Sequence, residues 1–305
     1  MKIAIVGAGF CGLALAYYLS QNKHVDITLI DRFGIGGGAS GIAAGLLHPY
    51  VGFKARLNWR GHEALEESKR LLEVANQRCP FGIVRIPQSD EQWALFQEAA
   101  DQYDDIEICQ SDQPAIFSRS GLTVNCPQYL QSLWDVTRSQ GVSFQKQEIY
   151  NLDQLGDFDC SFICNGPLAK ELLEIRLKLI KGQLLKFEWP EHLPPLKHSI
   201  VSKKYVVMNG KNACWVGGTY EHHFDHDNPD QAVAQKEILA DLEGFMPELT
   251  SASIIDCQAG VRAFAPDKRP FYKQINERTW VFTGMGSKGL LYHALMAKEL
   301  VSNFC

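Results

Sequence analysis

The sequence lacks several features that would define whole classes of protein. Its nine cysteines include no C-x-x-C pair, and scattered thiols of odd number argue against a disulfide framework or a zinc site. There is no internal repeat and no heptad pattern, which excludes a solenoid or a coiled coil. The net charge of −5 gives no overall basic surface, so we expect no DNA partner.

A membrane segment is also absent in our interpretation, although residues 3–19 carry no charge. Three glycines interrupt this run, no small-residue cleavage site precedes Lys23, and no stop-transfer flank follows. We therefore expect a cytoplasmic protein with no membrane partner. Its 305 residues, 46% of them hydrophobic, are ample for two lobes.

The same N-terminal stretch carries a dinucleotide-binding fingerprint. An apolar strand over residues 2–6 leads into G-x-G-x-x-G, a helical run covers residues 13–19, and a second strand over residues 25–30 ends in an acid. The glycines allow a tight turn, close approach of a pyrophosphate and close helix packing, and the acid would bind ribose hydroxyls. The predicted contacts are Gly7, Gly9, Phe10, Cys11, Gly12, Asp31 and Arg32.

A long segment of small residues follows the second strand. Residues 34–50 read GIGGGASGIAAGLLHPY, where a nicotinamide-binding Rossmann domain would normally continue into its next helix. Small residues permit close approach of the backbone to the extended second half of a cofactor. A flexible linker is the alternative interpretation.

This segment resembles the D-amino-acid oxidase family of FAD enzymes, which includes glycine oxidase and sarcosine oxidase. Residues 43–50 resemble the stretch along the isoalloxazine ring, and residues 38–41 resemble the turn near the pyrophosphate and ribitol. The resemblance implies FAD bound non-covalently, because residues 261–265 lack the cysteine that bonds the flavin in sarcosine oxidases. It implies contacts at Ala39, Ser40, Ala43, Ala44, Gly45 and Leu46, and a catalytic place for His48, for which a buried structural histidine is the alternative.

Residues 280–290, WVFTGMGSKGL, resemble the family's C-terminal strand, glycine turn and helix. In the family this helix N-terminus points at the N1–C2=O edge of the flavin, where reduction places negative charge. Lys288 would add a positive charge there; a solvent-facing lysine is the alternative. The implied contacts are Gly284, Gly286, Ser287, Lys288, Gly289 and Leu290, with Asn165 and Gly166 at the end of another strand.

Residues 260–270 resemble the family's G-x-R segment, in which an arginine binds the substrate carboxylate. A guanidinium suits this role because it makes two parallel bonds and keeps its charge. Arg262 is thus implied as a catalytic residue in oxidation of an amino-acid or amine substrate, with hydride transfer to flavin N5 and hydrolysis of the resulting imine. Structural pairing of Arg262 with an acid such as Asp267 is the alternative.

Other functions compete with amino-acid oxidation. The chain also resembles the flavin half of the bifunctional enzymes that remove a carboxymethyl group from the wobble uridine of bacterial tRNA. In that case tRNA is a partner, and a set of lysines would form a phosphate-binding face: Lys178, Lys181, Lys186, Lys197, Lys203 and Lys204. A solvated charged surface, a non-catalytic flavoprotein and a nicotinamide-dependent dehydrogenase are the remaining alternatives.

The predicted fold class is α/β, with a Rossmann-like FAD-binding domain of the GR2 type and an α+β substrate domain on an antiparallel sheet. We expect the FAD-binding domain to use residues 1–75, 122–170 and 257–305, and the substrate domain residues 76–121 and 171–256. Periodicity predicts strands over 82–86, 183–187, 205–208 and 213–216, and helices over 59–75, 91–103, 129–140 and 232–245. Residues 221–227, EHHFDHD, predict an exposed loop and no metal site.

Overall fold

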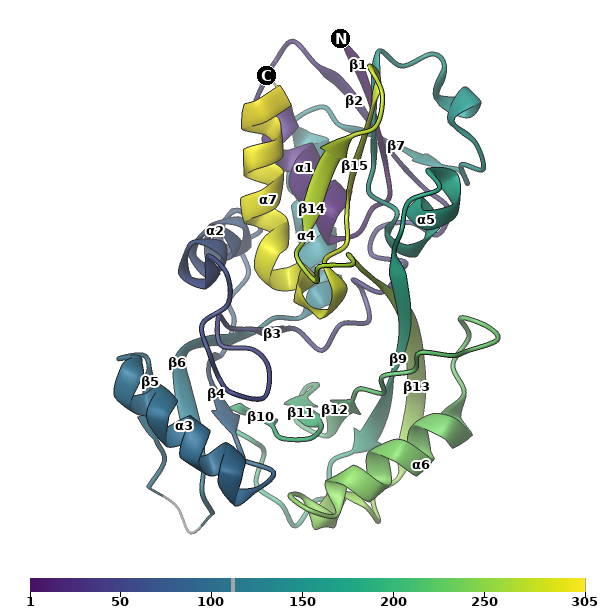
Figure 1. The fold of residues 1–305 in the computed structure, drawn as a ribbon. Helices are drawn as coiled ribbons and strands as arrows, with labels where there is room; N and C mark the ends of the chain where they lie inside the picture. Colours follow the sequence, from purple (N-terminus) through teal and green to yellow (C-terminus); the bar gives the residue numbers. More distant parts are fainter. Residues whose placement is uncertain (111–112, 305) are drawn as a thin grey trace.

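A computed structural model describes residues 1–110 and 113–304, and it contains two sheets (Figure 1). The first sheet has six strands, and five of them run parallel. In sheet order they are β14 (Phe271–Gln274, antiparallel), β15 (Thr279–Thr283), β8 (Cys160–Ile163), β1 (Lys2–Val6), β2 (Asp26–Asp31) and β7 (Ser143–Lys146).

Helices cover one face of this sheet. Helices α1 (Phe10–Ser20), α4 (Cys126–Ser139) and α7 (Gly289–Phe304) pack on the alternate residues of β1, β2 and β8 that point to this side. Helix α2 (Gly61–Val74) packs against α7. The opposite face is covered by residues 147–177, which include the short helix α5 (Ala169–Leu172). Burial on both faces explains the apolar character of the parallel strands.

The second sheet has nine strands, one of which, β5 (Ile106–Ile108), pairs only with β6. The other strands follow in sheet order: β13 (Ile254–Phe264), β9 (Lys178–Glu188), β12 (Ala213–Gly217), β11 (Tyr205–Met208), β10 (Ser199–Val201), β4 (Phe81–Arg85), β6 (Ile116–Thr123) and β3 (Leu46–Leu47). Its pairings are antiparallel except that of β4 with β10, which are more than 100 residues apart along the chain.

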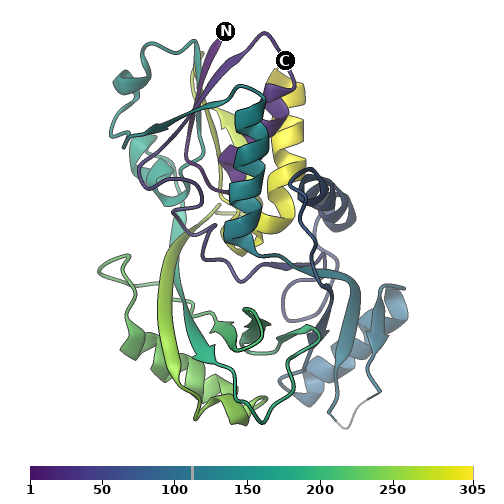
Figure 2. The ribbon, with the colours of Figure 1, turned by 180° about the vertical axis from the view of Figure 1, so that it is seen from behind.

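Two helices cover the side of this sheet that faces away from the first one (Figures 1 and 2). Helix α6 (Gln231–Leu242) closes a core with β9, β11 and β12, and α3 (Asp90–Gln102) closes another with β5 and β6. Both helices begin after a capping side chain, Asp230 for α6 and Ser89 for α3, which accepts a backbone N–H of the first turn.

The predicted fold class is confirmed, and each of the strands and helices listed from periodicity is present; the ends differ by a few residues, except that β9 begins at Lys178, five residues before the predicted strand. Strand β13 pairs with β9 along its whole length, so residues 257–264 belong to the second sheet by hydrogen bonding. The division into two domains stays a prediction. No helix in the described part of the chain is both long and apolar enough to cross a membrane.

Candidate active site

Helices α1 and α7 begin side by side at the carboxyl edge of the parallel strands. A Cβ atom at Gly289, the first residue of α7, would lie 3.3 Å from the Phe10 ring at the start of α1. Gly7, after β1, has φ +110° and lies against the backbone of Cys164 and Asn165, which follow β8. Two helix N-termini with free N–H groups thus face one region, a favourable place for an anionic group.

The predicted turn at residues 38–41 reaches this region. The Ser40 hydroxyl oxygen lies 3.1 Å from the Phe10 backbone nitrogen and accepts its N–H. A Cβ atom at Gly9 would lie 2.7 Å from the same oxygen, and one at Gly12 would lie 1.8 Å from the carbonyl oxygen of Gly7. Only glycine at these positions leaves the start of α1 open to a ligand and close to the sheet.

Residues 39–46 continue from this turn toward the second sheet. Ala39 contacts β13 at Gly260, where a Cβ atom would lie 2.9 Å from the Ala39 Cα. Gly45, with φ +80°, lies against Val124, whose N–H donates to the Gly45 carbonyl at 2.8 Å. Leu46 begins β3 and pairs with Thr123, and Ala43 and Ala44 lie partly buried between these anchors. The segment is held at both ends and is not a flexible linker.

Strand β13 carries Arg262 on the same face as Gly260 and Phe264, because side chains alternate along a strand. The Arg262 guanidinium crosses Gly182 of β9, where a Cβ atom would lie 2.3 Å from Nη2. Nη2 donates to the Thr219 carbonyl at 2.9 Å, and the guanidinium lies 5.0 Å from the Tyr220 ring centroid. Burial lowers the pKa of Arg262, but a guanidinium stays charged.

The glycine turn before α7 meets the end of β13. Phe264 forms an isolated bridge with Met285, and the Ala265 N–H donates to the Gly284 carbonyl at 3.2 Å. Gly286, with φ +55°, lies against the Phe264 ring. Arg262 is therefore two residues along β13 from Phe264, which contacts the turn before α7.

Comparison with known proteins decides what this arrangement is. The family model described as FAD dependent oxidoreductase (DAO) matches residues 2–302. The chain belongs to the DAO family of FAD-dependent oxidoreductases. The resemblance noted in the sequence is thus confirmed, and FAD is the cofactor of the family.

The chain is similar to several individual members of the family. It is 24% identical to the tRNA 5-methylaminomethyl-2-thiouridine biosynthesis bifunctional protein MnmC of Maricaulis maris, covering 98% of this chain but 51% of that protein. It is 26% identical to a putative thiamine biosynthesis oxidoreductase ThiO of Rhizobium etli, covering 98% and 95%. The glycine oxidase structure from Geobacillus kaustophilus superposes with a TM-score of 0.80 at 18% identity, covering 99% and 94%. The chain thus spans about half the length of the bifunctional relative.

The buried polar atoms at the strand ends fit a bound FAD. Asn165 Oδ1 and Arg262 Nε are among the buried polar atoms of the described residues that have no hydrogen-bond partner, and such atoms are available to a ligand. Gly166, after Asn165, accepts the Thr283 hydroxyl at 3.4 Å, which joins the ends of β8 and β15. Residues at the start of α1 and at Ser40 would hold the pyrophosphate of FAD.

Other predicted cofactor contacts are occupied by protein groups. The Asp31 carboxylate accepts the Ala8 N–H at 2.9 Å and the Phe33 N–H at 2.8 Å. Arg32 pairs with Glu148 at 2.7 Å and stacks on Phe33. Cys11 is partly buried and packs against the main core, and burial raises the pKa of its thiol to about 12.

The end of the glycine turn is more open. Ser287 is exposed and Lys288 is half-buried, while Leu290 is buried in the core between α1 and α7. Burial lowers the pKa of Lys288, and the nearby Lys268 lowers it further. The place of Lys288 beside the flavin stays a prediction.

Two tyrosines that the sequence interpretation did not select lie beside Arg262. Tyr205 of β11 has its hydroxyl against Gly217 and Gly218, within 3.1 Å of where either residue would carry a Cβ atom. Burial raises the pKa of Tyr205, and Arg262 acts in the opposite direction. The G-x-T-x-E pattern at residues 217–221 was the signal available, since its third residue binds Arg262 through the backbone.

His48 directly follows β3 and is buried close enough to Arg85 to feel its charge. Arg85 is 6% exposed and donates to the carbonyls of Tyr50 at 2.8 Å and Gly52 at 2.6 Å. Burial, and secondarily the charge of Arg85, lowers the pKa of His48 to about 3. His48 is therefore neutral at physiological pH, and its catalytic role stays a prediction.

Two buried neutral histidines predict acid destabilisation. Burial lowers the pKa of His48 to about 3 and that of His293 to about 4, whereas both titrate near 6.5 when unfolded. Below pH 6.5 the unfolded chain thus binds more protons than the folded protein does. The stability contributed by the two histidines is therefore fully present above that pH and is lost as the pH falls. The slope is roughly 1.4 kcal/mol per pH unit and histidine.

Urea unfolding between pH 7.5 and 5 should show that the free energy of unfolding falls less steeply for His293→Asn than for wild type. An unchanged slope would contradict this assignment.

The prediction that the six lysines form one phosphate-binding face is wrong. Lys181 is 2% exposed and donates to the His226 carbonyl at 3.1 Å, and Lys204 is 5% exposed. Lys203 pairs with Asp241 at 2.5 Å, and Lys186 lies over the Trp215 ring. Alternating strand positions and the acids of α6 explain why these lysines do not form one free basic patch.

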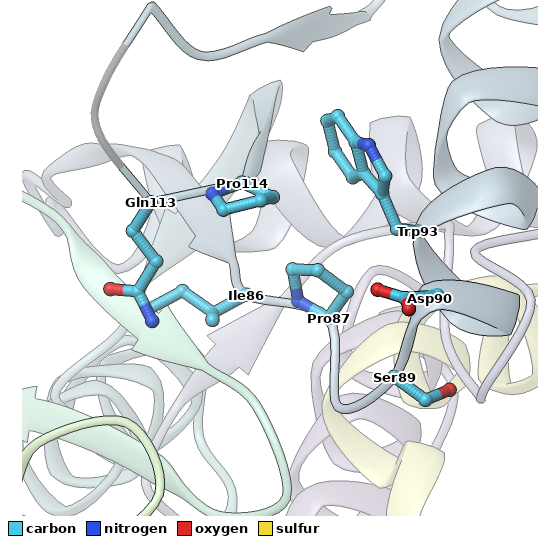
Figure 3. Close-up of a pocket in the computed structure, with 7 residues that line it drawn as sticks. All are labelled: Ile86, Pro87, Ser89, Asp90, Trp93, Gln113 and Pro114. Atoms are coloured by element: carbon cyan, nitrogen blue, oxygen red, sulfur yellow. The ribbon is translucent and has the colours of Figure 1, made fainter.

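One pocket lies outside this site (Figure 3). It has a volume of about 170 Å³. It lies between the end of β4, the start of α3 and the residues just before β6. Its walls are largely apolar, from Ile86, Pro87, Trp93 and Pro114. None of the predicted cofactor or catalytic residues lines it.

Proposed function

We propose that the chain oxidises the C–N bond of a glycine-like or N-substituted amino acid, and that Arg262 binds the substrate carboxylate. The observation that carries this proposal is the environment of Arg262. Arg262 is partly buried, its Nη2 donates to the neutral Thr219 carbonyl, and its buried Nε has no hydrogen-bond partner among the described residues. A buried cation without a bonded carboxylate leaves room for one from a ligand.

The acid nearest to this role is already engaged elsewhere. Glu221 acts on Arg262 only through space, while its Oε1 accepts the Gln183 side-chain amide at 2.9 Å and the Thr219 hydroxyl at 2.5 Å. Among the described residues no hydrogen bond or ion pair joins Arg262 to Asp267, whose Oδ1 accepts the Arg269 backbone N–H at 3.0 Å. Both observations support a ligand as the anion that Arg262 binds.

The chain's own residues would orient the substrate and stabilise charge at the reaction centre. Arg262 would fix the substrate carboxylate, and the Tyr205 hydroxyl and the Tyr220 ring border the same space. The N-terminus of α7 would stabilise negative charge at the reaction centre. When bound, FAD supplies the two-electron acceptor for oxidation of the amine. We propose that it is bound non-covalently, because Cys257 of β13 packs into the core on the α6 side.

Identification of products tests this proposal. The purified protein would be incubated with glycine or sarcosine and an electron-accepting dye, and the carbonyl product would be trapped and identified by mass spectrometry. Glyoxylate is the expected carbonyl product, together with ammonia from glycine or methylamine from sarcosine. Acid precipitation of the same sample should leave FAD in the supernatant. Dye reduction without a carbonyl product would contradict C–N oxidation.

A second candidate function is oxidation of a carboxymethyl-amine on tRNA, which a surface near the glycine turn favours. This surface, the Trp59 surface, consists of Trp59, Lys268 and Arg269. Trp59 is 42% exposed and lies 5.9 Å from the Arg269 guanidinium. Lys268 and Arg269 are exposed and come four and five residues after the end of β13, and Lys268 is close enough to Lys288 of the glycine turn to lower its pKa. Exposed aromatic and basic groups together are typical of single-stranded nucleic-acid binding.

RNA binding by the Trp59 surface gives a direct prediction. The double variant Lys268→Glu and Arg269→Glu should weaken binding of a labelled tRNA anticodon stem-loop by at least about tenfold, with a smaller dependence on salt. Fluorescence anisotropy measures this. Lys211→Glu, an equal change of charge per residue at an exposed position between β11 and β12, is the control. Equal affinity of all three proteins would contradict RNA binding at this surface.

A further inference from the structure

Lys204 is a buried lysine whose partners connect helix α6 to the backbone beside Arg262. It lies in the turn between β10 and β11, and its side chain is 5% exposed. Its Nζ lies 2.5 Å from Glu237 Oε1 and 3.4 Å from Asp241 Oδ2, both on α6. It also donates to the carbonyl oxygen of Gly218 at 3.0 Å. Burying an ammonium group is costly, and here several acceptors compensate it.

The Gly218 carbonyl belongs to the segment that orients Arg262. The next residue, Thr219, accepts Arg262 Nη2 through its own carbonyl at 2.9 Å. On its other side Thr219 is fixed by Gln183, whose N–H donates to the Thr219 hydroxyl at 2.9 Å and whose carbonyl accepts the Thr219 N–H at 3.1 Å. Lys204, whose acidic partners are on α6, therefore fixes the Gly218 carbonyl, and Gln183 of β9 fixes Thr219.

Lys204 also precedes Tyr205 in the chain. Tyr205 pairs with Gly217 across the β11–β12 ladder, and its hydroxyl lies against Gly217 and Gly218. A single ammonium group thus restrains the start of β11 and the peptide opposite it. Tyr205 at the start of β11 and Thr219 after Gly218 both interact with the Arg262 guanidinium.

We propose that Lys204 is a positioning residue for carboxylate binding by Arg262. This inference rests on the proposed function of Arg262. Loss of the ammonium group would free the Gly218 carbonyl and let the Thr219 carbonyl move, so that the guanidinium loses its fixed orientation. Because a misoriented fork binds a carboxylate less well, the substrate affinity would fall more than the rate of the bound complex.

A matched pair of lysines allows a specific test. Lys204→Met keeps an unbranched side chain one atom shorter than that of lysine and removes its charge. Lys203→Met is the control, because Lys203 is 62% exposed and pairs with the same Asp241 but donates to no carbonyl of the hairpin. Glu237→Gln is a milder variant at a position 41% exposed, and it weakens the hold on Lys204 without emptying the buried position.

The readouts are KM and kcat for glycine or sarcosine, and the dissociation constant of acetate measured from its perturbation of the flavin absorption spectrum. We expect Lys204→Met to raise KM and the acetate dissociation constant by about tenfold, with kcat within about threefold of wild type. Glu237→Gln should raise both constants by less, and Lys203→Met should change neither. If Lys204→Met yields no folded flavoprotein, the direction shown by Glu237→Gln decides.

Two outcomes overturn the inference in distinguishable ways. If wild type binds acetate and Lys204→Met binds it equally well, or if Lys203→Met and Lys204→Met weaken binding alike, Lys204 has no positioning role and the proposed function stands. If acetate perturbs neither wild type nor any variant and no amino acid is oxidised, the proposed role of Arg262 fails, and the inference about Lys204 fails with it.

Discussion

Replacement of Arg262 with alanine is expected to lower kcat/KM for the amino-acid substrate by about a thousandfold while the protein retains its FAD. The size follows from loss of a buried, charge-assisted double hydrogen bond, together with the orientation it gives to the substrate. FAD should remain because the predicted contacts with its pyrophosphate lie at α1 and Ser40, on other elements. Steady-state kinetics and the ratio of flavin to protein absorbance measure the two effects.

The variant Arg262→Lys is the matched control for charge. It keeps a cation but loses the planar fork and its contact with the Tyr220 ring, so we expect an intermediate loss of kcat/KM. A structural arginine would give another pattern, in which both variants lower the melting temperature and leave the kinetics of the remaining folded protein intact. Unchanged turnover in Arg262→Ala would show a non-catalytic role for this residue.

The second large effect is expected at Gly12. A Cβ atom there would lie 1.8 Å from the Gly7 carbonyl oxygen, a distance at which the backbone of α1 or of the turn must move. Because the N-terminus of α1 is the predicted pyrophosphate site, Gly12→Ala should yield protein that has lost FAD and has a lower melting temperature. Absorbance near the flavin band, and melting with and without added FAD, measure this.

Gly244→Ala is the control for a glycine substitution as such. A Cβ atom at Gly244 would meet nothing closer than the Asp241 carbonyl oxygen at 3.9 Å, which is an ordinary contact. This variant should keep its FAD and its melting temperature. FAD bound normally by Gly12→Ala would contradict the placement of the pyrophosphate at the start of α1.

The cofactor-binding part of the fold could be predicted from sequence because its signals are local. The G-x-G-x-x-G turn needs glycine for reasons visible within a few residues, such as the contact of Gly12 with Gly7. The pattern of apolar residues likewise predicted β4, β9, β11 and β12. The parallel pairing of β4 with β10 had no such signal, because it joins residues more than 100 positions apart.

The details of the site were less predictable because they depend on which residues share a space. Lys181 and Lys204 read as surface charges in the sequence, yet strand alternation and the acids of α6 bury them. Tyr205 comes near Arg262 only through the pairing of β11 with β12 and of β9 with β13. Sequence spacing carries no information on contacts of this kind.

The most direct test of amine oxidation by this protein is an anaerobic spectrum. The purified protein would be mixed without oxygen with glycine, sarcosine, D-alanine or L-proline, and the flavin band near 450 nm would be followed. Loss of that band with at least one amino acid, and its persistence in Arg262→Ala under the same conditions, is the predicted result. A flavin band that no amino acid removes from the wild-type protein would contradict amino-acid oxidation, and a colourless protein that does not take up FAD would contradict the cofactor assignment itself.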